Sequence, residues 1–292
     1  MNVLELAKSR AVLLDGGLGT ELMKRGLGQG QNPELWNVER PDAVQAVHRD
    51  YFQAGSDAVA TNSFGASRLK LESLGLAERC RELNRAAAAN AAAVRPAGRF
   101  VAGSIGPTGK ILKPQGEHTE GQFEESFFEQ ALGLAEGGAD FLILETFFDL
   151  REALCGLWGA KKAAPQLPLF ATLTYNRTKR GFYTMMGDSL AAATAALEKN
   201  GAAAIGANCT LASGEMISLA AELRRATALP TIVQPNAGQP DMGADGCTRY
   251  AQTPDQFAAD MLRIAAVGTN FVGGCCGTSP AFIRRLAERL PR

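Results

Sequence analysis

Short apolar runs alternate with longer helical patterns along the whole chain. Eight of these runs predict buried strands, because most are continuously apolar instead of alternating with polar residues. They cover 11–15, 57–62, 100–105, 141–145, 169–175, 204–209, 231–236 and 270–275. The helical patterns cover 42–54, 67–94, 121–137, 149–163, 189–199, 213–227, 254–267 and 280–290. Gly55, Gly138, Gly201 and Gly268 stand where a helix should end before the next strand.

This order of elements predicts an α/β protein with a single (β/α)8 TIM barrel. Eight strand–helix units fit the 292 residues, and we expect one barrel domain over 1–292. An open doubly wound sheet would favour a G-x-G-x-x-G turn after the first strand. The sequence there is DGGLGTEL, which lacks that spacing. No linker, low-complexity tract or charge run divides the chain.

Composition narrows the class of protein and its partners. Hydrophobic residues make up 46% and charged residues 21%, so the chain can bury a full core. Thirty Lys plus Arg balance thirty Asp plus Glu, which argues against nucleic acid or a membrane surface as partner. The first residues show no secretory signal, and no apolar run approaches the roughly 20 residues of a membrane span. We therefore expect a cytoplasmic protein whose six cysteines stay as thiols or bind metal.

The ends of the predicted strands carry polar and thiol side chains. Barrel enzymes place their reactive groups at the C-terminal ends of the strands. Read in order, those positions are Asp15, Asn62, Ser104, Glu145, Tyr175, Cys209, Asn236 and Cys275–Cys276. No strand contains a lysine, which weakens a Schiff-base mechanism. At Asp15 and Glu145 we favour recognition of an amino group over a role as helix cap or ion-pair partner.

Three of the cysteines predict a metal site. Cys209 ends the sixth strand and Cys275–Cys276 ends the eighth, so the three thiols can converge across the barrel mouth. Three thiolates suit Zn²⁺, and three protein ligands with one exchangeable position are typical of a catalytic zinc site. Asn236, at the end of the intervening strand, can supply a weak oxygen ligand that a substrate displaces.

The remaining cysteines and the histidines have simpler interpretations. Cys80, Cys155 and Cys247 are expected to be small buried hydrophobic residues. His48 is expected to be structural, and His118 lies in a loop after the third strand that can cover the mouth. The roles of this loop, 106–120, and of the loop 175–188 are not determined by the sequence.

Two other classes of function stay open at this point. GGCCGTSP (273–280) can bind phosphate through backbone N–H groups, which would make the chain a metal-free barrel enzyme acting on a phosphorylated substrate. Gly273, Gly274 and Gly277 would form that loop. Alternatively, Cys275 and Cys276 can pair as a vicinal disulfide in a non-catalytic redox-sensing module.

Seven segments in order resemble the homocysteine S-methyltransferase family. They are LLDGGLGTEL, TNSFGASRLKL, GSIGPTG, LILETF, GANCT, QPNAG and GGCCGTSP, and they span 11–280. Among members, the chain looks most like the homocysteine-binding module of cobalamin-dependent methionine synthase. The resemblance implies a barrel that transfers a methyl group to the thiol of homocysteine, giving methionine. Another small thiol as acceptor is the main alternative within this class.

The resemblance also assigns roles to residues. It implies that Cys209, Cys275 and Cys276 bind zinc, with Asn236 as the ligand in the resting state. It implies that Asp15 and Glu145 hold the amino group of homocysteine. The backbone of Gly16, Gly17 and the segment Thr61, Asn62, Ser63 would lie near that group. No residue of the chain acts as nucleophile, because zinc activates the substrate thiol.

The methyl donor is left open. The sequence ends at Arg292 and contains no D-x-H-x-x-G cobalamin motif. We therefore expect only the acceptor half of a methionine synthase. The donor is then a methyl-corrinoid on a separate protein or a small methylated compound.

Overall fold

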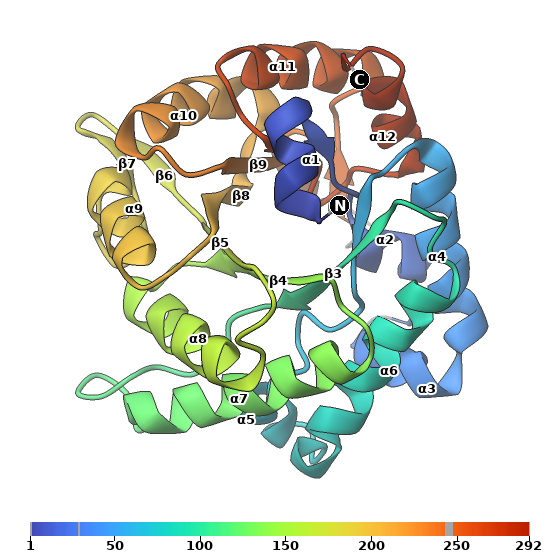
Figure 1. Cartoon of the computed structure of the whole chain (residues 1–292), viewed down its shortest axis with the longest axis vertical. Helices are drawn as coiled ribbons and strands as arrows, with labels where there is room; N and C mark the ends of the chain where they lie inside the picture. Colours follow the sequence, from blue (N-terminus) through green and yellow to red (C-terminus); the bar gives the residue numbers. More distant parts are fainter. Residues whose placement is uncertain (1, 29, 243–247, 292) are drawn as a thin grey trace.

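Eight parallel strands form an almost closed ring with helices around it (Figure 1). The computed structural model describes residues 2–28, 30–242 and 248–291. The strands of the ring are β1 (Val12–Leu13), β2 (Ala58–Ala60), β3 (Phe100–Ile105), β4 (Phe141–Phe147), β5 (Leu169–Leu173), β8 (Ala204–Ala212), β9 (Thr231–Asn236) and β12 (Phe271–Val272). Their order in the sheet is β1-β12-β9-β8-β5-β4-β3-β2. The predicted barrel is confirmed, and all eight strands lie within or across the predicted runs.

The seam between β1 and β2 is joined by carboxylates as well as by backbone groups. The backbone N–H of Asp57 donates to the Leu13 carbonyl at 2.6 Å, and the Asp57 carboxylate accepts from the Leu13 N–H at 2.9 Å. Higher along the seam, the Asp15 carboxylate accepts from the Ala60 N–H at 2.8 Å. Asp57 is fully buried, and Arg10 offsets its charge with two hydrogen bonds.

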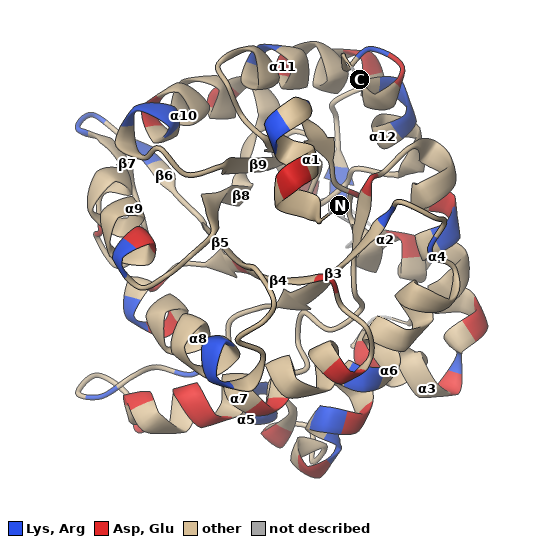
Figure 2. Cartoon of the chain, viewed as in Figure 1, with Lys and Arg blue, Asp and Glu red and all other residues tan. Residues whose placement is uncertain are grey.

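Helices surround the sheet, and seven of the eight predicted helical segments form single helices. The helices are α1 (Val3–Ser9), α2 (Leu18–Lys24), η1 (Pro33–Leu35), α3 (Trp36–Glu39), α4 (Pro41–Ala54), α5 (Arg68–Glu72), η2 (Ala77–Arg79), α6 (Cys80–Ala93), α7 (Glu120–Glu136), α8 (Leu150–Ala163), α9 (Leu190–Lys199), α10 (Ser213–Ala226), α11 (Pro254–Ala266) and α12 (Pro280–Ala287). Of these, α1, α2, η1 and α3 were not predicted. The four glycines predicted to end helices all adopt positive φ, from 91° to 107°. Lys and Arg are interspersed with Asp and Glu around the outer helices (Figure 2).

The prediction of one helix over 67–94 is wrong. The segment forms α5, then η2, then α6. Gly75 has φ +70° and ends the first piece, with the Leu76 N–H donating back to the Leu71 carbonyl at 3.0 Å. This is the pattern by which glycine terminates a helix, and it prevails over the apolar periodicity on either side.

The N-terminal end of the barrel is covered by α1, which the sequence did not predict (Figure 1). Val3 and Leu6 of this helix are buried in one apolar cluster with Phe141, Phe170 and Phe271, which begin or lie early in their strands. The packing leaves the C-terminal ends of the strands, where the polar and thiol residues stand, at the opposite end of the barrel.

Two hairpins were also not predicted. Strands β6 (Asn176–Thr178) and β7 (Gly181–Tyr183) pair in the connection after β5, and β10 (Pro240–Met242) and β11 (Thr248–Tyr250) pair in the connection after β9. Cys247, which was predicted to be buried, lies outside the described residues. Within the described ranges, none of the helices has the length and apolar character needed to cross a membrane.

Candidate functional site

Three cysteine sulfurs meet at the C-terminal end of the barrel. Cys209 comes from β8, and Cys275 and Cys276 lie in the loop after β12, which ends at Val272 and not at Cys275 as predicted. All three sulfur atoms lie within 4.8 Å of one another, and those of Cys275 and Cys276 are 4.0 Å apart. A tetrahedral zinc site with Zn–S bonds of about 2.3 Å separates its sulfurs by about 3.8 Å. The donor set therefore fits a tetrahedral soft cation after closing by about 1 Å or less.

The backbone at Cys209 departs from a regular strand. Cys209 and Thr210 have φ +59° and +60°, in the left-handed region, and the register of β8 with β9 shifts between Asn208 and Ala212. A β-branched residue rarely adopts this conformation, and such bulges re-aim side chains beside active sites. The sequence predicted that the strand ends at Cys209, whereas it resumes after the bulge and runs to Ala212.

The thiols share their protons unequally. Hydrogen bonds from Cys275 and then Cys276 lower the pKa of Cys209 to about 3. The same interaction with Cys209 raises the pKa of Cys275 well above its usual range and that of Cys276 to about 11. A divalent cation at this point would favour ionisation of all three.

Cys80 and Cys155 are fully buried elsewhere in the fold. Burial raises the pKa of Cys80, and it raises that of Cys155 to about 12. Both thiols therefore stay protonated at neutral pH and pack as small apolar groups.

Asn236 lies against the cysteine cluster. It ends β9, is 3% exposed, and its Oδ1 accepts a hydrogen bond from the Cys276 N–H at 3.1 Å. Its side chain also hydrogen-bonds the Cys209 thiolate and helps to lower the pKa of that thiol. The structure places it beside the three sulfurs, and its role as an oxygen ligand stays a prediction.

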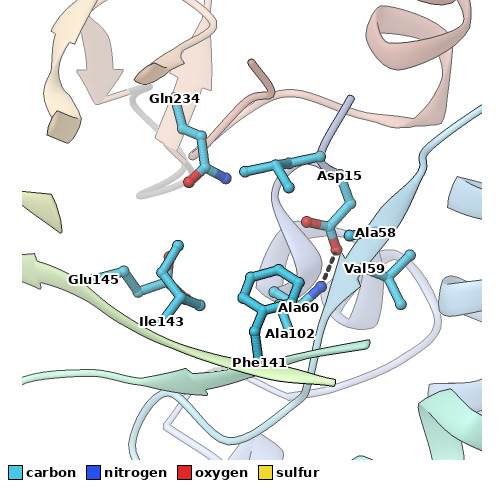
Figure 3. A pocket seen from close by; sticks show the side chains of 10 residues that line it. Asp15, Ala58, Val59, Ala60, Ala102, Phe141, Ile143, Glu145 and Gln234 are labelled. Carbon is cyan, nitrogen blue, oxygen red and sulfur yellow. Dashed lines mark hydrogen bonds between the residues drawn. The ribbon is translucent and has the colours of Figure 1, made fainter. Parts of the chain in front are cut away.

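Asp15 and Glu145 face the same small cavity inside the barrel (Figure 3). Burial raises the pKa of Asp15 well above its usual range, and the nearby charge of Glu145 raises it further. Burial also raises the pKa of Glu145 to about 6, although Ser104 donates a hydrogen bond to it. Two desolvated carboxyls on one cavity suit a cationic group, which would lower both pKa values.

The other predicted substrate residues brace the ends of β1 and β2. A Cβ on Gly16 would lie 2.6 Å from the Thr278 carbonyl oxygen, and the Gly17 N–H donates to that oxygen at 2.9 Å. The hydroxyls of Thr61 and Ser63 are 2.6 Å apart. Glycine is therefore required where the loop after β1 approaches the loop that carries Cys275 and Cys276.

The three side chains of the segment after β2 are engaged by protein groups. Thr61 Oγ1 accepts from the Ser104 N–H at 2.9 Å, and Ser63 Oγ donates to the Ser104 carbonyl at 2.7 Å. Asn62 donates to the Pro33 carbonyl at 2.7 Å. These bonds tie the ends of β2 and β3 together and hold the segment before α3 against them.

Three residues at the site were missed by the sequence reasoning. Gln234 lines the cavity with Asp15 and Glu145, and its Oε1 is buried without a partner among the described residues (Figure 3). Asn208 donates to Cys275 Sγ at 3.9 Å. The Tyr250 ring packs on Gly277, and its hydroxyl is hydrogen-bonded to Cys276. Gln234 and Asn208 stand within the quoted motifs QPNAG and GANCT, which was the available signal.

Comparison with known proteins agrees with this geometry. Residues 12–290 match the family described as Homocysteine S-methyltransferase. The chain belongs to the homocysteine S-methyltransferase family. It is 36% identical to methionine synthase of Mycobacterium tuberculosis over 98% of this chain, and 35% identical to that of Mycobacterium leprae over 100% of it. The chain spans about a quarter of the length of these relatives, 25% in each case.

Solved structures show the same barrel. The homocysteine methyltransferase MmuM from Escherichia coli, in its metallated form, is 27% identical with a TM-score of 0.81, and the match covers 99% of this chain and 100% of that one. The carboxyl transferase domain of Rhizobium etli pyruvate carboxylase, 14% identical with a TM-score of 0.55, covers 98% of this chain and 49% of that one. The latter likeness extends to the fold alone. Family membership rests on the family match over residues 12–290 and on the mycobacterial relatives.

Proposed function

We propose that this member of the homocysteine S-methyltransferase family transfers a methyl group to the thiol of homocysteine and forms methionine. The observation that carries the proposal is the convergence of three cysteine sulfurs within 4.8 Å at the C-terminal end of the barrel. The family match over 12–290 and the name of the E. coli relative support homocysteine as acceptor.

Cys209, Cys275 and Cys276 would hold a zinc ion, with Asn236 as the oxygen ligand before substrate binds. Bound zinc would stabilise the substrate sulfur as thiolate, which is the nucleophilic form of a thiol. The three cysteines hold the metal and take no part as nucleophiles, since the acceptor is the substrate's own sulfur.

Asp15 and Glu145 would receive the ammonium group of homocysteine. The charge of Cys209 raises the pKa of Glu145, so the carboxyl lies within electrostatic reach of the thiol cluster. A small molecule that carries both an ammonium and a thiol can therefore bridge the two sites. Gly16, Gly17 and the backbone of Thr61–Ser63 would lie near the bound ammonium group, and fixing the amino end orients the sulfur.

The methyl donor is either a methyl-corrinoid or a small methylated compound. The names of the mycobacterial relatives favour neither for this chain, which spans a quarter of their length. The two kinds of donor can be distinguished by measuring methionine formation with methylcobalamin and, separately, with a methylated sulfonium or quaternary ammonium compound.

The decisive experiment is metal content by mass spectrometry on protein purified without chelator and with its thiols reduced. We expect about one zinc per chain, lost in Cys209→Ala and retained in Cys155→Ala, whose thiol is buried away from the cluster. Methionine production should disappear with the zinc. A chain that binds no zinc even after reconstitution under reducing conditions would contradict the proposal.

A further inference from the structure

Two bulges at the site hold side chains on a strained backbone. Of the described residues other than glycine, Thr146, Cys209 and Thr210 have positive φ, at 66°, 59° and 60°. Thr146 stands in a register shift of β4 against β5, directly after Glu145. Left-handed threonines are sparse in proteins and persist only where surrounding contacts impose them. The same distortion therefore occurs beside the candidate ammonium site and at the candidate metal site.

One buried side chain joins both bulges. Asn208 is 1% exposed, and its Oδ1 accepts hydrogen bonds from the Thr146 N–H and the Thr172 hydroxyl, both at 2.8 Å. Its Nδ2 donates to Thr146 Oγ1 at 2.7 Å and to Cys275 Sγ at 3.9 Å. All four hydrogen-bonding positions of the amide are used. Two of them clasp the left-handed Thr146, and one reaches a candidate metal ligand.

We propose that Asn208 is a positioning residue that sets the spacing between the ammonium site and the metal cysteines. The inference rests on the proposed function. The two hydrogen bonds with Asn208 hold Thr146 in the left-handed region. Because Thr146 follows Glu145 in β4, its conformation fixes the direction in which the Glu145 side chain points. If the bulge relaxed and the register of β4 shifted by one residue, the side chains beyond it would point to the opposite face of the sheet. The neighbouring bulge aims Cys209, and the amide N–H orients the sulfur of Cys275.

Replacing a buried asparagine that has only a structural role should lower stability without affecting the metal site. Asn84 is a fully buried amide whose Nδ2 donates to the Ala66 carbonyl at 2.8 Å and to the Cys80 carbonyl at 2.7 Å, on the outer side of the fold. Asn84→Ala is therefore the matched control. It should lower the Tm as Asn208→Ala does, and it should leave zinc affinity and the KM for homocysteine unchanged.

The experiment combines Asn208→Ala with Thr146→Gly. In Asn208→Ala we expect Tm to fall by roughly 5–10 °C in the metal-free protein. We expect zinc affinity, measured by chelator competition, to fall ~10–100-fold, as for other groups that orient metal ligands. Adding Thr146→Gly should recover at least half of the loss in Tm, because glycine adopts positive φ without strain. Zinc affinity and the KM for homocysteine should stay impaired, because glycine does not restore the clasp or the bond to Cys275.

The outcomes separate this inference from the proposed function. If the wild-type chain binds no zinc, the proposed function fails. If the wild type binds zinc, and Asn208→Ala resembles Asn84→Ala in zinc affinity and KM, the positioning role is wrong while the proposed function stands. Recovery of all three measurements in the double variant would equally overturn the role, since Thr146 strain alone would then account for the defect.

Discussion

The hydroxyl of Tyr51, in the last turn of α4, donates a hydrogen bond of 2.9 Å to the backbone carbonyl of Thr278. The same carbonyl accepts from the Gly17 N–H at 2.9 Å, and the Thr278 hydroxyl donates to the Cys275 carbonyl at 2.7 Å. Tyr51 is completely buried. A side chain on the outer ring of helices thus fixes the loop that carries two of the three candidate metal ligands.

Tyr51→Phe removes this hydroxyl and keeps the ring. We expect a loss of about 1–2 kcal/mol in the free energy of unfolding, because the buried carbonyl loses one of its two donors. We also expect zinc affinity to fall several-fold, since the loop of Cys275 becomes looser. Chemical denaturation and chelator competition measure the two effects. Tyr183→Phe, at a partly exposed tyrosine of β7, is the control, and an equal effect of both substitutions would refute the role of the loop contact.

Close packing between the loop after β1 and the cysteine loop gives a second prediction. A Cβ on Gly17 would lie 2.7 Å from Thr20 Oγ1 and 2.9 Å from the Cys275 carbonyl oxygen, whereas a Cβ on Gly19 would meet nothing within 4 Å. Gly17→Ala should therefore displace the Cys275 loop and lower zinc affinity. Gly19→Ala, inside α2, should instead stabilise the protein by up to about 1 kcal/mol. Zinc titration and thermal melts of both variants test this, and wild-type zinc affinity in Gly17→Ala would contradict it.

The sequence predicted the barrel strands because their hydrophobic pattern follows directly from their burial. Continuous apolar runs identify all eight barrel strands because a parallel sheet covered by helices buries both of its faces. Because parallel strands share one C-terminal edge, the order of the strands then predicts that Cys209 and Cys275 lie close together, although β8 runs past Cys209 and β12 ends before Cys275. The paired strands β6–β7 and β10–β11 were missed because each is only three residues long and carries no apolar alternation.

Backbone strain and long-range contacts were beyond the sequence. Because threonine disfavours positive φ, the sequence does not predict the left-handed conformation of Thr146 and Thr210. Tyr51 looks like a core residue on the apolar face of its helix, and its hydrogen bond depends on a loop far along the chain. Gln234 lies inside β9 and not at its end, so its position in the sequence does not indicate that it faces the cavity.

The carboxyl pair predicts how the amino group of the substrate is recognised. Glu145→Gln keeps the shape of the side chain and removes its charge, so we expect the KM for homocysteine to rise ~10–100-fold, the effect of a lost charge-assisted hydrogen bond. Zinc content should not change. The matched comparison is a thiol of the same length without an amino group, for which wild type and variant should perform alike. An equal penalty with both thiols would place the defect at the metal site instead.

A buried histidine predicts the acid sensitivity of the fold. His48 is completely buried in α4, and neither ring nitrogen has a partner among the described residues. Burial lowers the pKa of His48 to about 4, below the value of about 6.5 for an unfolded chain. As the pH falls below about 6.5, His48 becomes protonated in the unfolded state but stays neutral in the folded state. Stability is therefore lost between pH 6.5 and 4, by up to ~3 kcal/mol.

The substitution His48→Leu isolates this contribution, because other titrating groups cancel when variant and wild type are compared at each pH. The difference in free energy of unfolding between them should be constant above pH 7. It should then shift in favour of the variant by ~2–3 kcal/mol on lowering the pH to 4.5. His118→Leu, the same change at the partly exposed histidine, leaves His48 in place and should retain the acid-dependent loss. Denaturant titrations across this range decide the matter, and parallel curves for wild type and His48→Leu would show that the buried ring takes up its proton without cost.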